Sequence, residues 1–167
     1  KQKYLASINT RYDGASNLGE NYRWGFFPGV SLGWNMHREN FMGKFTNVLS
    51  KSKLRVSYGE NGNTNALSPY LAQGSYGVGG RYAGTGTILN TVLENPELKW
   101  EEARTFDIGA DLEFFNNLRF TFDYYRRVTN NLVSNRTLPH ETGFGSITTN
   151  LGSVENKGFE IELGVQP

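Results

Sequence analysis

The sequence predicts an all-β fold in which antiparallel strands form part of a transmembrane β-barrel. Three observations support this prediction. Six segments alternate apolar and polar side chains with a period of two, which places neighbouring side chains on opposite faces of a strand. Short connections between these segments alternate with long ones. The 167 residues include 20 glycines and 14% aromatic residues, a composition that suits strands joined by many turns.

Composition excludes several other classes of protein. No run approaches the ~18 consecutive apolar residues of a membrane-spanning helix, so a helical membrane protein is excluded. The 17 Lys and Arg residues are balanced by 16 Asp and Glu residues, which leaves no general attraction for nucleic acid. The absence of cysteine excludes disulfides and thiolate metal sites. His37 and His140 are far apart and lack a spaced partner, so we expect no metal site.

The first two expected strands carry aromatic and apolar side chains on one face. In the first strand, this face consists of Tyr4, Ala6, Ile8, Thr10 and Tyr12. In the second, which alternates most clearly, it consists of Trp24, Phe26, Pro28, Val30, Leu32, Trp34 and Met36. Glycines on the opposite face of the second strand lose much conformational freedom on ordering. We therefore expect either a bend in the strand or the close approach of another group, such as a plug domain.

The other four expected strands repeat this separation of side chains. The third sets Leu54, Val56 and Tyr58 against Lys53, Arg55 and Ser57. The fourth sets Phe106, Ile108, Ala110, Leu112 and Phe114 against Thr105, Asp107, Asp111 and Glu113. The fifth sets Leu118, Phe120, Phe122 and Tyr124 against Arg119, Thr121, Asp123 and Tyr125. The sixth sets Phe159, Ile161, Leu163 and Val165 against Gly158, Glu160, Glu162 and Gly164.

The connections between the strands fall into two kinds. Residues 115–117 form a tight hairpin, and the connection from Met36 to Lys53 is expected to contain a helical turn. In contrast, long loops are expected over about 60–97 and 135–149. Short turns on one side and long loops on the other are typical of outer-membrane barrels, in which the turns are periplasmic and the loops extracellular.

The solvent that meets the apolar face distinguishes a membrane barrel from a soluble β-sandwich, which alternation alone also describes. Trp24 and Trp34 are ten residues apart. At ~3.3 Å per residue and a tilt of ~40°, they span about 25 Å, the height of the apolar band between aromatic girdles. We therefore expect a lipid face and girdle that include Trp24, Phe26, Val30, Leu32, Trp34, Ile108 and Phe120.

Five motifs carry a resemblance to a known family. Residues 22–34 read Y-R-W-G-F-F-P-G-V-S-L-G-W and resemble the N-R-W-G-x-F-P-S-x-S-x-G-W stretch of SusC/RagA-like TonB-dependent transporters, with Gly29 in place of the usual serine. The resemblance continues, in the family's order, through residues 11–16, 53–63, 95–101 and 150–158. It spans almost the whole chain and leaves residues 66–93 and 135–149 as the variable loops.

The resemblance implies the rest of the expected molecule. Such transporters form 22-stranded outer-membrane barrels closed by a plug, so residues 1–167 are expected to be a partial barrel domain, truncated at both ends, with about a quarter of the wall. It implies uptake of oligosaccharide or peptide with a SusD-like surface lipoprotein and with the TonB complex, which contacts N-terminal parts absent from this chain. No cofactor and no enzymatic activity are expected. A soluble carbohydrate-binding or adhesive β-sandwich and a passive porin remain the alternatives.

Two groups of residues are candidate functional sites. The expected lumen wall contains Asp107, Asp111, Glu113, Arg119, Asp123 and Arg127. If their two strands pair through the hairpin, acids and bases lie across from each other and form a structural charge ladder, with cargo contact as the alternative. Cargo or the capping partner is expected to touch Tyr70, Tyr76, Arg81, Tyr82 and His140, because tyrosine stacks on rings and carries a hydroxyl group. Simple loop packing is the alternative for each.

No catalytic constellation is predicted. The sequence has no G-x-S-x-G elbow of a serine hydrolase. The glycine-rich residues 77–86 lack the register of a phosphate-binding loop and do not begin a helix. Three acids alternating along one strand are better explained by a polar lumen than by glycoside hydrolysis. An outer-membrane enzyme is therefore the least favoured reading.

Overall fold

The main element of the structure is a single six-stranded antiparallel sheet. The computed structural model describes residues 2–45, 47–65 and 67–165, so the two ends of the expected domain, residues 1 and 167, and Ala66 in the expected variable loop lie outside the described residues. All six expected strands are confirmed. In sheet order they are β1 (Tyr4–Gly14), β2 (Trp24–Asn35), β3 (Leu49–Asn63), β6 (Glu101–Phe114), β7 (Leu118–Asn130) and β10 (Ser153–Val165).

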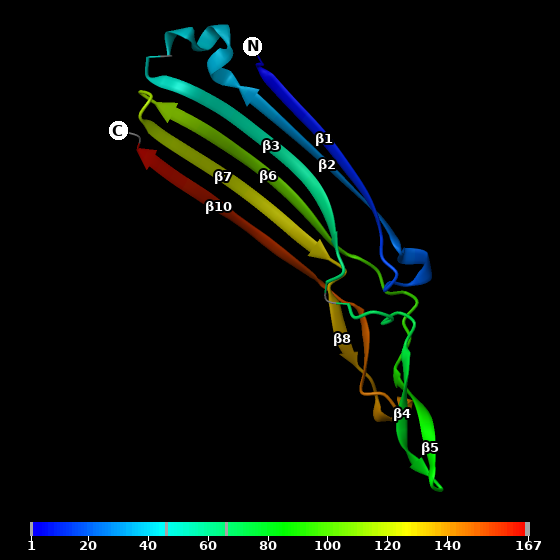
Figure 1. Cartoon of the computed structure of the whole chain (residues 1–167). Helices are drawn as coiled ribbons and strands as arrows, with labels where there is room; N and C mark the ends of the chain where they lie inside the picture. Colours follow the sequence, from blue (N-terminus) through cyan, green and yellow to red (C-terminus); the bar gives the residue numbers. More distant parts are fainter. Residues whose placement is uncertain (1, 46, 66, 166–167) are drawn as a thin grey trace.

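The sheet is one curved layer. Figure 1 shows no second sheet against either face of the six strands in the described part of the chain. Within this part, β1 pairs only with β2 and β10 only with β7, so the sheet does not close into a barrel by itself. A soluble sandwich needs a second layer to cover its apolar face, and the described residues form no such layer.

The strand register gathers the apolar side chains on one face. Ala6, Leu32, Val56, Ile108 and Tyr124 lie in one row across five strands. No other part of residues 2–45, 47–65 and 67–165 covers this face: 80% of the surface of Ile8 and 69% of that of Leu163 are exposed. The predicted lipid-face residues lie on this same side, which we call the apolar face: Trp24, Phe26, Val30, Leu32, Trp34, Ile108 and Phe120.

Two hairpins extend beyond one end of the sheet, where the sequence predicted only loops. One consists of β4 (Ser75–Tyr82) and β5 (Thr85–Val92), and the other of β8 (Val133–Thr137) and β9 (Ser146–Asn150), with η4 (His140–Thr142) between the latter two (Figure 1). The two-residue turn between β4 and β5 has positive φ at Ala83 and Gly84, as a tight hairpin requires. Neither hairpin buries a face, so neither shows a marked hydrophobic alternation.

Short 3₁₀ helices lie in the remaining connections. η1 (Glu20–Tyr22) joins β1 to β2, and η2 (Met36–Arg38) and η3 (Asn40–Lys44) join β2 to β3. The helical turn expected between Met36 and Lys53 is therefore confirmed. None of the helical elements in the described residues is long and apolar enough to cross a membrane.

A small hydrophobic core lies where the sheet meets the hairpins. It consists of Leu18, Phe27, Leu67, Ala72, Leu98 and Trp100. The Phe27 and Trp100 rings meet edge to face, with centroids 5.4 Å apart. A Cβ atom on Gly25 or Gly62 would collide with these rings, so both glycines make room for the core. The close approach expected at the β2 glycines thus occurs at Gly25, and side chains of this chain make it.

Candidate functional site

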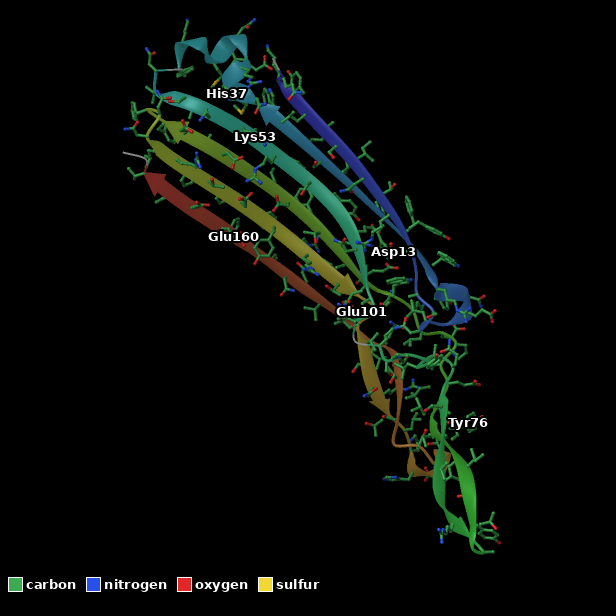
Figure 2. The ribbon with its side chains drawn as sticks, viewed as in Figure 1. Asp13, His37, Lys53, Tyr76, Glu101 and Glu160 are labelled. Atoms are coloured by element: carbon green, nitrogen blue, oxygen red, sulfur yellow. The ribbon has the colours of Figure 1, made fainter. Side chains whose placement is uncertain are left out.

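The polar face of the sheet carries the predicted lumen-wall residues. The register places Lys53 opposite Asp111 and Ser57 opposite Asp107, on the side away from the apolar face. It also places Glu160 opposite Asp123. In Figure 2, Lys53 on β3 and Glu160 on β10 lie along the sheet, while His37 lies at one end and Tyr76 lies beyond the other.

Arg55 joins three strands on this polar face. Its Nε donates to Asp111 Oδ2 at 2.9 Å, and its Nη2 donates to Asp123 Oδ1 at 2.9 Å. Arg55, Gly109 and Asp123 lie in one row across β3, β6 and β7. A Cβ atom on Gly109 would meet both the Arg55 guanidinium and the Asp123 carboxylate. The missing side chain at Gly109 therefore lets Arg55 reach across β6.

The expected charge pairs across the β6–β7 hairpin are only partly present. The register sets Glu113 opposite Arg119, but Asp111 faces Thr121 and Asp123 faces Gly109. The acids pair with β3 instead. Lys51 Nζ lies 2.8 Å from Glu113 Oε2, and Arg55 holds the two aspartates.

Charged residues of the polar face outside the predicted set include Lys51, Lys53, Arg55, Glu160 and Glu162. Four of them alternate on the polar face within the expected strands, so their facing was available from the sequence. The facing of Lys51 could not be predicted, because Lys51 precedes Lys53, where the alternation of the third strand begins. Their pairing depends on which strands are neighbours, and β3 pairs with β6 across an intervening hairpin. The alternation alone does not contain that information.

Replacing Arg55 by methionine is expected to lower the free energy of unfolding of the full-length protein by about 1–2 kcal/mol. Two carboxylates then share one region without a cation, although about a third of the Arg55 side chain is open to solvent, which reduces the effect. Denaturant unfolding of the detergent-solubilised protein measures this change. Lys53→Met is the matched control, because Lys53 lies on the same face and forms no ion pair with another described residue. Equal effects of both changes would contradict the assigned network.

The predicted loop residues lie on or beside the hairpins. Tyr76 and Tyr82, on β4, are 73% and 80% exposed, and Arg81 lies next to Tyr82. Tyr70 is also exposed, in the segment before β4, with a φ of 64°. His140 begins η4, which belongs to the other hairpin. The structure thus gathers Tyr76, Arg81 and Tyr82 on one hairpin and leaves His140 on the second.

Hydrogen bonds connect the base of the β8–β9 hairpin to residues 95–101, one of the five family motifs. Asn150 accepts a hydrogen bond from Lys99 N at 2.9 Å and donates to Lys99 O at 3.0 Å. Asn95 Nδ2 donates to Thr148 O at 2.8 Å. The buried Glu101 carboxylate accepts from Val133 N at 2.8 Å. The motif therefore positions the β8–β9 hairpin at this end of the sheet. Its polar composition did not predict this role.

Glu39 organises the opposite end of the sheet, where the short connections lie. Its carboxylate accepts hydrogen bonds from Lys3 Nζ at 2.9 Å, Tyr4 OH at 2.8 Å and Trp34 Nε1 at 3.2 Å. Tyr4 and Trp34 are partners in the register and their rings are stacked. At the far end of the same two strands, Tyr12 stacks on Trp24 with centroids 5.3 Å apart. The apolar face is thus bordered by an aromatic pair at each end.

The stability contributed by Glu39 is expected to depend on pH. Hydrogen bonds from Lys3, Tyr4 and Trp34 hold the pKa of Glu39 below its ordinary value of 4.5. A group with a lowered pKa stabilises the folded state above its unfolded pKa and loses this effect as the pH falls through the folded value. The stability difference between the wild type and Glu39→Gln should therefore be present at pH 7 and shrink below pH 4.5. Denaturant midpoints at several pH values test this, with the exposed Glu141→Gln as the control. A difference that persists unchanged at the lowest pH contradicts it.

The two histidines occupy different settings. Nδ1 of His37 lies 3.0 Å from Ser52 O and 3.3 Å from Ser52 N, and this contact holds the ring against β3. His140 lies on an exposed loop. No group of three or more His, Cys, Asp or Glu side chains suited to a metal ion occurs in the described residues.

Comparison with known proteins assigns this arrangement to a family. Residues 2–166 match the family model described as TonB dependent receptor-like, beta-barrel. The chain is 40% identical over 166 residues to TonB-dependent receptor P3 of Formosa agariphila, covering 96% of this chain and 16% of that protein. It is 36% identical over 174 residues to TonB-dependent receptor SusC of Bacteroides thetaiotaomicron, covering 99% of this chain and 17% of that protein.

Solved structures agree with the sequence relatives. The RagAB peptide importer in its closed-closed state matches with a TM-score of 0.87 and 28% identity, over 97% of this chain and 18% of that chain. Its open-open state matches with a TM-score of 0.86. The chain therefore spans about a sixth of the length of the relatives it matches. Members of the family are receptors and transporters of the Gram-negative outer membrane and are not enzymes. With the two-faced open sheet, these findings show that the chain belongs to the TonB-dependent receptor β-barrel family, in its SusC/RagA-like group.

Proposed function

We propose that the protein to which this chain belongs imports a nutrient across the outer membrane, driven by TonB, and that this chain is part of the barrel wall. The separation of the two faces carries the proposal. Apolar side chains lie uncovered along one face and charged side chains line the other, as lipid on the outside and a polar lumen on the inside require. The hairpins then extend outside the cell and the short connections face the periplasm.

The proposed cargo is an oligosaccharide or a peptide, received together with a SusD-like surface lipoprotein. The similarity to SusC and to the RagAB peptide importer supports this class of cargo and partner. The residues proposed to touch cargo or lipoprotein are Tyr70, Tyr76, Arg81, Tyr82 and His140. Exposed tyrosines on an extended hairpin offer ring faces and hydroxyl groups to either one.

The proposed role of the lumen-wall charges is structural. The residues concerned are Asp107, Asp111, Glu113, Arg119, Asp123 and Arg127. Ion pairs with β3 occupy three of the four acids, which leaves them less able to hold cargo. In this proposal, recognition occurs at the hairpins and the wall provides a polar surface.

An uptake assay on the full-length protein in its host tests the proposal. Labelled oligosaccharide and labelled peptide are supplied separately, with and without a protonophore that removes the energy source for TonB. We expect uptake of one cargo class, lost with the protonophore. Energy-independent uptake would instead indicate a passive porin.

The hairpin tyrosines are tested in the same assay. Tyr76→Ala combined with Tyr82→Ala should reduce uptake while the amount of protein at the cell surface stays constant. Tyr12→Ala is the matched control, since Tyr12 is an exposed tyrosine on the apolar face. Unchanged uptake in the double variant would refute the proposed contact.

A further inference from the structure

An apolar groove of about 460 Å³ lies on the apolar face across β1, β2 and β3. Two register rows line it, Tyr4–Trp34–Leu54 and Ala6–Leu32–Val56. Ala6 leaves the space, because its methyl group stands between the much larger Tyr4 and Ile8 on the same strand face. The lining is almost entirely apolar, so the groove suits a hydrocarbon chain.

The groove is bounded at its periplasmic end by the residues around Glu39. The Trp34 ring lies edge to face against Phe41 of η3, with centroids 6.4 Å apart. Phe41 and Phe45 are each 58% exposed, and Val48 is exposed nearby in the chain. Exposed aromatic rings beside a tryptophan of the apolar face are typical of a segment at the membrane interface.

Positive charge predominates at this same end. Within residues 2–4 and 36–44, the charged side chains are Lys3, Arg38, Lys44 and one carboxylate, Glu39. Lys3, Tyr4 and Trp34 already occupy that carboxylate, which leaves Arg38 and Lys44 exposed on the 3₁₀ segment. Arg38 donates one hydrogen bond to Gln2 O at 2.8 Å. An anionic group at the membrane surface is thus attracted to the end of the groove.

We propose that this groove and its basic border form a binding site for one anionic phospholipid of the periplasmic leaflet. An acyl chain lies along Ala6, Leu32 and Val56, and the phosphate contacts Arg38 and Lys44. A second copy of the chain is a poorer occupant, because a two-fold contact would bring the two basic borders together. The proposal depends on the place of the chain in an outer-membrane barrel and not on the cargo, lipoprotein or TonB steps above.

Native mass spectrometry of the full-length protein tests the site. The protein is washed free of lipid in detergent and then offered either phosphatidylglycerol or phosphatidylcholine. Ala6→Trp, which fills the groove, should bind one phosphatidylglycerol fewer than the wild type. Ile8→Trp is the matched control on the same strand and face, and it should bind the wild-type number.

The basic border is tested separately. Arg38→Gln combined with Lys44→Gln should weaken phosphatidylglycerol binding about 25-fold, at about fivefold for each cation, and leave phosphatidylcholine binding unchanged. Both side chains are exposed, so this variant remains decisive if Ala6→Trp does not assemble. Equal lipid counts for Ala6→Trp and Ile8→Trp would overturn the site. Wild-type affinity of the double variant for phosphatidylglycerol would also overturn the site. The same holds if Ala6→Trp removed a protein dimer from the spectra and no bound lipid.

Discussion

Replacing Trp100 by alanine is expected to lower the free energy of unfolding of the hairpin end of the sheet by about 3–5 kcal/mol, the usual cost of removing a large buried ring. Trp100 is 9% exposed and packs against Phe27 in the core that joins the sheet to the hairpins. The cavity would lie next to Gly25 and Gly62, which have no side chains to fill it. Both hairpins should therefore become sensitive to protease added to intact cells.

Trp24→Ala is the matched control for this prediction. Trp24 is also a tryptophan near the same end of the sheet, but it is 64% exposed and stacks on Tyr12 on the apolar face. Its loss should leave the hairpins as resistant to protease as in the wild type. If Trp100→Ala and Trp24→Ala behaved alike, the small core would not be what holds the hairpin end of the sheet together.

Replacing Ile108 by arginine should destabilise the membrane-inserted protein by about 2–4 kcal/mol, the cost of a cation on the lipid face near the bilayer midplane. Ile108 lies between Val56 and Tyr124 in the register, within the apolar stretch of β6 from Phe106 to Phe114. Heat-dependent electrophoretic mobility and denaturant unfolding in lipid vesicles measure this loss.

Ser57→Arg is the matched control, because it adds the same charge as Ile108→Arg but on the polar face. Ser57 follows Val56, the β3 partner of Ile108, and lies opposite Asp107 on the polar face. A new arginine there meets water and a carboxylate, so we expect stability close to that of the wild type. Unchanged assembly and heat stability of Ile108→Arg would show that the two faces had been assigned the wrong way round.

The six strands of the sheet were predictable because each lies between two different solvents. In β2, Trp24, Phe26, Val30, Leu32 and Trp34 alternate with small or polar residues except at Phe27, and a shift of one residue would exchange the faces. The strand ends were less predictable. β3 extends from Leu49 to Asn63, well beyond the alternating window from Lys53 to Tyr58, because its ends lie outside the apolar band.

The hairpins and the ion pairs were not predictable, for two different reasons. Val78 and Ile88 face each other on β4 and β5 yet stay exposed, so pairing of backbone groups forms this hairpin without a buried face to leave a pattern. The partners of Arg55 follow from neighbours in space and from the absence of a side chain at Gly109. Neither condition can be read from a single strand.

The link from Arg55 across Gly109 to Asp123 sets the charge of this part of the polar face. One guanidinium faces two carboxylates, so Arg55 offsets only one of the two negative charges, and the three side chains together keep one net negative charge. If this face lines the lumen proposed above, a cationic peptide is attracted to this stretch more strongly than an uncharged sugar.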